Sequence, residues 1–248
     1  MGGGRPADEA TPKTDFASGA GVFAPEGEGR SGTAEQVVLQ VIRALYEGRY
    51  APGQKLLESD LSQRFGIGRG TVREALRRLE AEGIVTAALN RGASIRMFSR
   101  RAVTGLLEVT AELAALAARL AAERVGSGHD VAPLDRALAE LQNAIEARSP
   151  YDLSRARYGF YRVLAETTGN QELGRILVRN DMAIVRTQFR AAFSLESEAE
   201  RVAHYGVVVR HVANGNPSGA ERAMRAAAQN VLRDIGKLPD HLFASDAP

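Results

Sequence analysis

The stretch GRGTVREALRRLEAEGIVTAALNRGASI, residues 68–95, has the pattern of a basic helix followed by a hairpin. Apolar residues at intervals of three and four positions predict a helix over residues 69–82, and Gly83 suits the position just after its end. Two short apolar runs on either side of residues 90–92 predict a β-hairpin, whose turn needs the positive φ that Gly92 can adopt. The stretch is therefore expected to be a helix and a hairpin.

Two further helices are predicted upstream. Apolar residues recur at helical spacing from Thr33, and Gly48 ends that helix. A shorter helix covers ESDLSQRF, residues 58–65, and residues 66–68 turn the chain into the basic helix. A short helix, a turn and a basic helix form the plan of a helix-turn-helix, in which the second helix enters the major groove of DNA.

The first turns of the basic helix and the hairpin carry the residues expected to contact DNA. Arg69 and Arg73 are four residues apart, and a guanidinium pairs bidentately with guanine O6 and N7 or clamps a phosphate. Thr71 can bond to a base edge or to a phosphate. Arg91 at the hairpin tip suits a narrow minor groove, and Gly92 lets the backbone approach DNA closely.

Two interpretations are open for Arg77 and Arg78, which follow in the same helix. They can contribute to DNA binding, or they can be solvated and pair with Glu74, Glu80 or Glu82, as most surface charges do.

The composition is that of a helical globular protein, with 44% hydrophobic, 25% charged and 6% aromatic residues among 248. A net charge of +2 is too small to indicate a nucleic-acid partner, but residues 31–100 hold eleven Arg or Lys against seven Asp or Glu. The absence of cysteine excludes disulfides and thiolate metal sites. No signal-peptide or membrane-spanning pattern is found, so we expect a cytoplasmic protein with no membrane partner.

Only helical patterns follow Ser99. A leucine stripe marks the first helix, a second helix ends before Pro150, and a third reaches about Thr168. A fourth helix is expected from an Asn170 N-cap to about Phe193, and two more follow at about 197–213 and 218–236. The leucine stripe consists of Leu106, Leu113, Leu116 and Leu120. The expected fold class is mainly α, with an N-terminal winged helix-turn-helix and a C-terminal all-α antiparallel helical bundle.

The run YAPGQKLLESDLSQRFGIGRGTVREALRRLEAEGIV, followed by NRGASI, closely resembles the winged helix-turn-helix of the GntR family of bacterial transcription regulators. The helical remainder resembles the ligand-binding domain of the FadR subfamily, the FCD type, and the resemblance covers about residues 33–236. It implies that the residues matching Arg69, Thr71, Arg73 and Gly92 contact operator DNA.

Two positions depart from the family pattern. Gly68 stands where a Ser or Thr commonly caps the recognition helix, which weakens the cap by a few tenths of a kcal/mol. Ser59 stands where some members place a DNA-contacting Arg, so one contact is in doubt.

The resemblance also implies where a metal would lie, because many relatives hold a divalent ion through an Asp and three His on three helices. Matching the motifs places Arg157 at the Asp, Tyr161 and Tyr205 at the first two His, and Ala227 at the third. A shift of one residue would put His204 in place of Tyr205, and one His among these residues would still bind a metal poorly. We therefore expect no metal and no cofactor.

The remaining histidines do not rebuild such a site. His204 and His211 are seven residues apart on one predicted helix, roughly 10 Å along its axis, whereas nitrogen ligands lie about 2 Å from a zinc ion.

Arg157, Tyr161 and Tyr205 would instead offer one cation and two hydroxyl donors to a carboxylate or phosphate. The alternative is that Arg157 points to solvent and the two tyrosines fill the core. Effector binding by these three residues is the hypothesis; metal-dependent effector binding, or loss of ligand control, are the alternatives within the family.

The resulting hypothesis is a transcription regulator, expected to be a repressor, that binds a pseudo-palindromic operator as a homodimer and responds to a small organic-acid-like effector. An enzyme is the rival class. Carboxylates such as Glu166 are present, but no nucleophile is paired with a base and no phosphate-binding glycine loop occurs. The expected division is a disordered tail (1–30), a DNA-binding domain (31–99), an effector and dimerisation domain (100–236) and a C-terminal tail (237–248).

Overall fold

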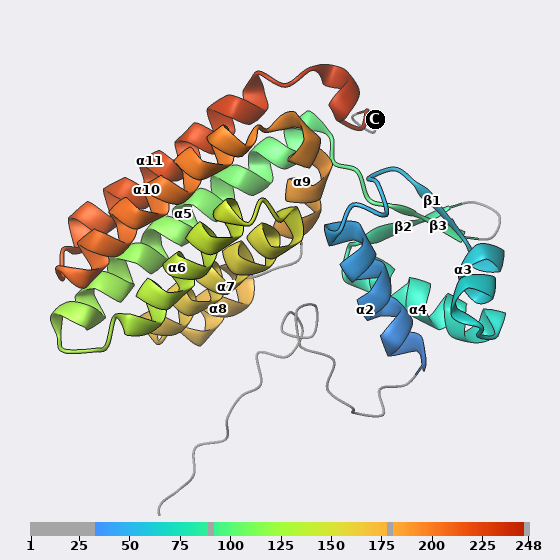
Figure 1. Ribbon diagram of the computed structural model, residues 1–248, viewed down its shortest axis with the longest axis horizontal. Helices are drawn as coiled ribbons and strands as arrows, with labels where there is room; N and C mark the ends of the chain where they lie inside the picture. The colour runs from blue at the N-terminus through green and yellow to red at the C-terminus, as the bar shows by residue number, and fades with distance from the viewer. Residues whose placement is uncertain (1–32, 89–91, 178–180, 246–248) are drawn as a thin grey trace, which may run out of the picture.

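The computed structural model describes residues 33–88, 92–177 and 181–245. Within these residues the chain is mainly helical, with ten α-helices and one three-stranded sheet. A smaller part with the sheet lies beside a larger part made of helices (Figure 1). The mainly α fold class is therefore confirmed. The tail predicted over residues 1–30 lies outside the described residues.

The smaller part has the predicted helix order. Its helices are α2 (Thr33–Tyr46), α3 (Glu58–Phe65) and α4 (Arg69–Ala81). Its strands are β1 (Lys55–Leu57), β2 (Val85–Ala88) and β3 (Gly92–Ile95), all antiparallel in the order β1-β3-β2. Gly66 and Gly83 adopt the positive φ angles of 64° and 71° that turn the chain after α3 and α4.

Strand β1 was not predicted, because three residues carry too little pattern to distinguish a strand from a loop. Pairing with β3 makes Lys55–Leu57 a strand, so its formation depends on a contact more than thirty residues away in the chain. The strand places Leu56 in the core and closes the sheet beside the hairpin.

Gly92 does not adopt the positive φ predicted for it. It is the first residue of β3 and pairs with both Leu57 and Ala88. A methyl group at Gly92 would overlap the carbonyl oxygen of Leu56, so the sheet requires glycine here for close packing of two strands.

The larger part consists of seven helices among the described residues. These are α5 (Arg100–Gly126), α6 (Ala132–Glu146), α7 (Pro150–Thr168), α8 (Gln171–Leu177), α9 (Asp181–Phe189), α10 (Leu195–Ala213) and α11 (Pro217–Gly236). Most lie side by side along the length of this part (Figure 1). No helix of the described chain is both long and apolar enough to cross a membrane.

The central helix α5 buries alanines more completely than its leucine stripe. Its fully buried face is mostly alanine, and the small side chains let α11 and α7 approach closely. The alanines are Ala111, Ala114, Ala115, Ala117, Ala118, Ala121 and Ala122. Leu106, Leu113, Leu116 and Leu120 are only half-buried. The leucine pattern therefore identified the helix but not its innermost face.

The helix expected from Asn170 to Phe193 is observed as two helices, α8 and α9, and residues 178–180 between them lie outside the described residues. Asn170 is the predicted cap, since its Oδ1 accepts a hydrogen bond from the Leu173 amide at 3.0 Å. The end near Phe193 is a 3₁₀ turn over Arg190–Ala192.

The segment 237–245, expected as part of a tail, is ordered against the junction of the two parts. Phe243 is buried and packs on Phe189, with ring centroids 4.9 Å apart. The amide of Ala244 donates to the carbonyl of Phe98 at 3.1 Å. Arg100 donates to the carbonyls of Ile235, Gly236 and Leu238, which closes the end of α11.

One hydrophobic core runs across the junction. It joins buried residues of α2 and α4 to Ile184, Phe189, Ile235 and Phe243 of the larger part. The Gln188 side chain fastens the connecting chain, because it accepts from the Phe98 amide and donates to the Phe98 and Leu242 carbonyls at 2.8 to 2.9 Å. The helix α9 is therefore in direct contact with the connection between the two parts.

We predict that Gly92→Ala lowers the free energy of unfolding by about 1 to 3 kcal/mol, because the new methyl group meets a backbone oxygen that cannot turn away. Gly105→Ala in α5 is the control. No atom lies near its added methyl group, and alanine in a helix should stabilise the protein by roughly 0.5 to 1 kcal/mol. Urea unfolding measures both, and equal effects would contradict the close contact at Gly92.

Candidate nucleic-acid interface and ligand cavity

Three of the residues expected to contact DNA, Arg69, Thr71 and Arg73, lie on the first turns of α4, at an exposed edge of the smaller part. Arg69 is the first residue of α4 and is exposed, Thr71 is half-buried, and the Arg73 side chain is 57% exposed. Gly68 caps α4 without a side-chain hydrogen bond, so the first amides of the helix also face this edge. Arg91 lies outside the described residues. The start of α4 thus presents two guanidinium groups and one hydroxyl.

Arg77 and Arg78 form surface ion pairs with a glutamate, which is the alternative to DNA contact that the sequence left open. Both bind Glu74, with nitrogen to oxygen distances of 3.3 Å and 3.1 Å. All three side chains are at least 43% exposed, so the pairs contribute little to stability and do not prevent either arginine from approaching a phosphate.

The structure adds one residue to this edge. Glu58, the first residue of α3, accepts two hydrogen bonds from Nε of Arg73, at 3.1 Å and 2.9 Å. The two residues are fifteen positions apart, on the two helices of the helix-turn-helix. Helical spacing cannot reveal such a contact, because it depends on how α3 crosses α4.

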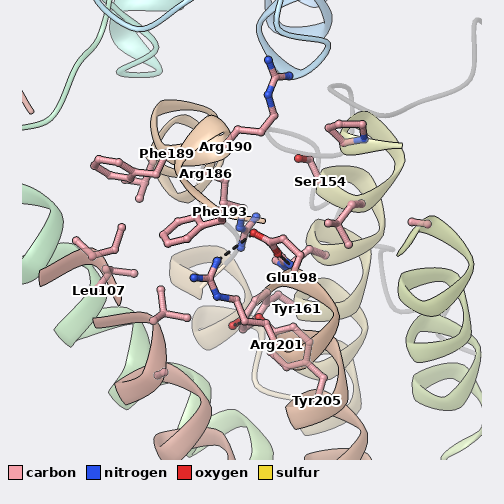
Figure 2. Close-up of a pocket in the computed structure, with 18 of the residues that line it drawn as sticks. Leu107, Ser154, Tyr161, Arg186, Phe189, Arg190, Phe193, Glu198, Arg201 and Tyr205 are labelled. Carbon is pink, nitrogen blue, oxygen red and sulfur yellow. Dashed lines mark hydrogen bonds and ion pairs between the residues drawn. The ribbon is translucent and has the colours of Figure 1, made fainter. Parts of the chain in front are cut away.

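The larger part contains a partly open cavity of about 300 Å³, and its lining residues Phe189 and Ile235 also belong to the core shared with the smaller part. Helices α5, α7, α9, α10 and α11 contribute to its walls, together with the 3₁₀ turn. Leu107, Phe189 and Phe193 give the cavity an apolar region, and charged side chains including Glu198 and Arg201 lie beside it (Figure 2). A cavity of this size is at the lower end of the range for small-molecule sites.

Arg157, Tyr161 and Tyr205 all line this cavity, as the sequence hypothesis required. Arg157 is buried rather than solvated, with only 8% of its side chain exposed. The hydroxyls of Tyr161 and Tyr205 are 3.2 Å apart, and their rings meet edge to face. Burial and the neighbouring Tyr205 raise the pKa of Tyr161 well above its ordinary value, so this hydroxyl stays protonated.

Sequence reasoning missed the carboxylate at the centre of the site. Glu198 Oε2 accepts from Arg157 at 2.5 Å, and Glu198 Oε1 accepts from Arg201 at 3.0 Å. Arg201 also donates to Asp234 of α11 at 3.0 Å and lies over the Phe193 ring. One charged cluster therefore connects α7, α10 and α11.

The arginines control the protonation of Glu198. Burial by itself would raise its pKa, but the charges of Arg157, Arg201 and Arg186 and the hydrogen bond from Arg157 lower it further than burial raises it. Glu198 is therefore a carboxylate at neutral pH. Arg157, Arg186 and Arg201 all act on Glu198, and Asp234 is a second carboxylate beside Arg201.

Two donors in this cluster lack an acceptor. The Nε atoms of Arg157 and Arg201 are buried and make no hydrogen bond in the described structure. A buried N–H without a partner is costly, so these atoms indicate a place where an additional acceptor group would be favourable. Arg186 and Arg190 also line the cavity.

The residues present do not suit a metal ion. A buried guanidinium stands at the position of the expected Asp ligand, and Ala227 offers no ligand atom. Tyr205, and not His204, lines the cavity. Nε2 of His204 lies 2.9 Å from Nδ2 of Asn230, and Nδ1 of His211 lies 3.4 Å from Nδ2 of Asn216. Among the described residues, no three His, Cys, Asp or Glu side chains gather in a group able to hold a metal.

Glu166, named above as a carboxylate of the rival enzyme class, lies away from the cavity. It is exposed on α7 and pairs with Arg162 at 2.8 Å, as expected for a surface pair at i and i+4.

This architecture defines a winged helix-turn-helix protein with a helical domain that encloses a ligand-sized cavity. Residues 33–95 match the model of the bacterial regulatory proteins of the gntR family, and residues 105–230 match the FCD domain. The chain therefore belongs to the GntR family and carries an FCD domain, which confirms the resemblance.

Individual relatives agree with this assignment. The HTH-type transcriptional regulator YdhC of Bacillus subtilis is 26% identical over 139 residues, which are 56% of this chain, and the chain spans only 62% of YdhC. LutR of the same organism is 28% identical over 74% of this chain and 92% of its own length. A solved GntR transcriptional regulator from Rhodococcus sp. RHA1 has the same fold, with a TM-score of 0.71 at 20% identity over 84% of this chain and 100% of that one.

We predict that Glu198→Ala lowers the free energy of unfolding by about 3 to 5 kcal/mol, because Arg157 and Arg201 would lose the carboxylate that compensates their buried charges. The control is Glu166→Ala, which breaks an exposed pair and should cost about 0.5 kcal/mol or less.

The Glu198 contribution should depend on pH. Its folded pKa lies below the ordinary value of 4.5, so the stabilisation is fully present above that value and is lost as the pH falls through the folded pKa. Urea unfolding at several pH values should therefore show the difference between wild type and Glu198→Ala shrinking in acid. A difference that grows in acid would contradict the charged cluster.

Proposed function

We propose that this protein is a sequence-specific DNA-binding transcription regulator, acting as a repressor, in which residues 31–99 bind DNA and residues 100–236 bind an effector and dimerise. The observation that carries the proposal is the start of α4, where Arg69 and Arg73 are exposed and Thr71 is half-buried beside them on a winged helix-turn-helix of the GntR family. In such a fold this end of the helix meets base edges in the major groove.

The DNA target is a pseudo-palindromic operator bound by a homodimer. A two-fold axis relating two chains would place two copies of α4 in successive major grooves, about 34 Å apart. Contacts of Arg91, which lies outside the described residues, and of Gly92 with the minor groove are part of the same proposal. Soluble regulators of this kind act in the cytoplasm.

Arg69→Ala is expected to weaken binding to the preferred DNA site by about 1 to 3 kcal/mol, because one bidentate contact to a base is lost. The site would be selected from random duplexes with the full chain, and affinities measured by fluorescence anisotropy. The control is Arg175→Ala, which removes an exposed cation of α8 paired with Glu172. Unchanged affinity of Arg69→Ala at several salt concentrations would exclude Arg69 from the interface.

The proposed effector is a small organic anion with an apolar body, bound without a metal. Arg157, Arg186 and Arg201 all line the cavity, and two buried Nε–H groups lack acceptors, which favours a carboxylate or phosphate on the ligand. The aliphatic and aromatic wall suits the rest of the molecule. Tyr161 and Tyr205 supply hydroxyls that fix its orientation.

Effector binding would reach the DNA-binding domain through α9 and the 3₁₀ turn. Phe189 and Arg190 line the cavity, while Gln188 holds the connecting chain. The Arg190 side chain points toward the smaller part (Figure 2). Its guanidinium lies so close to Gly48 that a methyl group added at Gly48 would overlap it. A shift of this segment would therefore change the position of α2 and with it the distance between the two copies of α4.

Citrate, benzoate and inorganic phosphate serve as probes of the cavity, with uncharged benzamide as the comparison. At least one anion should raise the melting temperature, since binding to the native state stabilises it. Arg186→Ala should abolish the shift, whereas Arg175→Ala should retain it. Arg190→Ala should bind the anion but leave DNA affinity insensitive to it.

Elemental analysis of the purified protein completes this test. One zinc, nickel or manganese ion per chain would contradict the metal-free proposal, and so would an anion response that survives Arg186→Ala.

A further inference from the structure

The contact between Glu58 and Arg73 joins the two helices of the helix-turn-helix at their DNA-facing edge. Both carboxylate oxygens of Glu58 accept from one atom, Nε of Arg73, at 3.1 Å and 2.9 Å. The Glu58 side chain is only 14% exposed, whereas the Arg73 side chain is 57% exposed. The carboxylate is thus held against the protein while the arginine extends outward from it.

This contact occupies Nε of the Arg73 guanidinium and leaves its two Nη groups available. Nε is taken by Glu58, while Nη1 and Nη2 of Arg73 make no hydrogen bond within the described chain. A guanidinium offers donors in a fixed, planar fork, so an arginine can meet guanine O6 and N7 either with its two Nη groups or with Nε and one Nη. With Nε occupied, only the approach through the two Nη groups remains.

The location of Glu58 adds a second effect. Glu58 and Arg73 both line a shallow groove between α4 and the sheet, next to Arg77 and Gly92. A carboxylate on a DNA-facing surface repels phosphate, so it disfavours any position of the arginine that would place it along the backbone. The charge of Glu58 therefore opposes nonspecific binding, and its hydrogen bonds direct Arg73 toward bases.

We propose that Glu58 is a positioning residue for sequence recognition, which restricts Arg73 to an end-on contact with one guanine and suppresses its contact with phosphate. The inference rests on the proposed function, since it requires that α4 bind DNA. An arginine that is oriented before binding loses less conformational entropy when it meets its base, and this gain applies only to the base that fits.

A purely structural role for the pair predicts a different result. An ion pair with an exposed arginine is worth about 1 kcal/mol or less to folding, and its loss would weaken binding to every DNA sequence alike or not at all. Loss of a positioning residue instead changes the ratio between the affinities for specific and nonspecific DNA. The change comes from lost discrimination at a single base pair.

The experiment uses the full chain and the DNA site selected with wild-type protein. Affinities of wild type, Glu58→Ala, Arg73→Ala and the double variant are measured for the selected site, for its single-base variants and for a scrambled duplex. Glu74→Ala is the matched control, because it removes a carboxylate of α4 that pairs with Arg77 and Arg78 and leaves Arg73 untouched. Urea unfolding of each variant establishes that all are folded.

We expect Glu58→Ala to lower the ratio of specific to nonspecific affinity about tenfold. The loss of discrimination should be confined to one base pair of the site, the same one that Arg73→Ala no longer discriminates. The affinity of Glu58→Ala for scrambled DNA should be unchanged or higher. The double variant should discriminate no worse than Arg73→Ala alone, because Glu58 acts through Arg73. Glu74→Ala should keep the wild-type ratio.

The inference is overturned if Glu58→Ala still discriminates the Arg73-dependent base pair, if Glu74→Ala lowers the ratio equally, or if the two substitutions are additive. These outcomes leave the proposed function intact, since wild type would still bind its selected site. A wild-type chain that enriches no sequence from random duplexes would instead refute the proposed function itself.

Discussion

The need to compensate buried arginine charges is the constraint on which the larger part of the structure depends. Arg157 and Arg201 come from different helices, and both are almost excluded from water. A lone buried cation would cost several kcal/mol, so α7 and α10 must pack where Glu198 of α10 reaches Arg157, while Arg201 meets Glu198 within α10 itself. Asp234 extends the same requirement to α11. The same charged groups therefore form part of the cavity lining.

Arginine has opposite roles in the two parts of the molecule. Around α4 the arginines are exposed, their pairs with glutamate are weak, and exchange of a carboxylate for a phosphate or a base costs little. In the cavity the pairs are desolvated and cannot be broken without a replacement anion. Segment 184–193 lies between these regions, with Phe189 in the shared core and Arg190 against Gly48. Under the proposed function, this segment would connect the bound effector to the DNA-binding helix.

Most of the local structure could be predicted, because it depends on patterns within about fifteen residues. The ends of α3, α4 and α7 follow from glycines that adopt positive φ, and the order of the helices follows from apolar spacing. Strand β1, the innermost face of α5 and the packing role of Gly92 were not predictable in this way. Strand β1 depends on its pairing with β3, and the innermost face of α5 depends on its packing against α11. The role of Gly92 depends on the nearby carbonyl of Leu56.

The sequence by itself determined the winged helix-turn-helix, the all-helical remainder and the two arginines at the start of α4, because regular spacing and turn residues act through local backbone geometry. It also identified Arg157, Tyr161 and Tyr205 through a family motif. Only the tertiary structure decided that Glu198 and Glu58 are the carboxylates beside these groups. Such pairs join residues from separate helices, and the crossing of two helices is set by side-chain packing that no periodicity records.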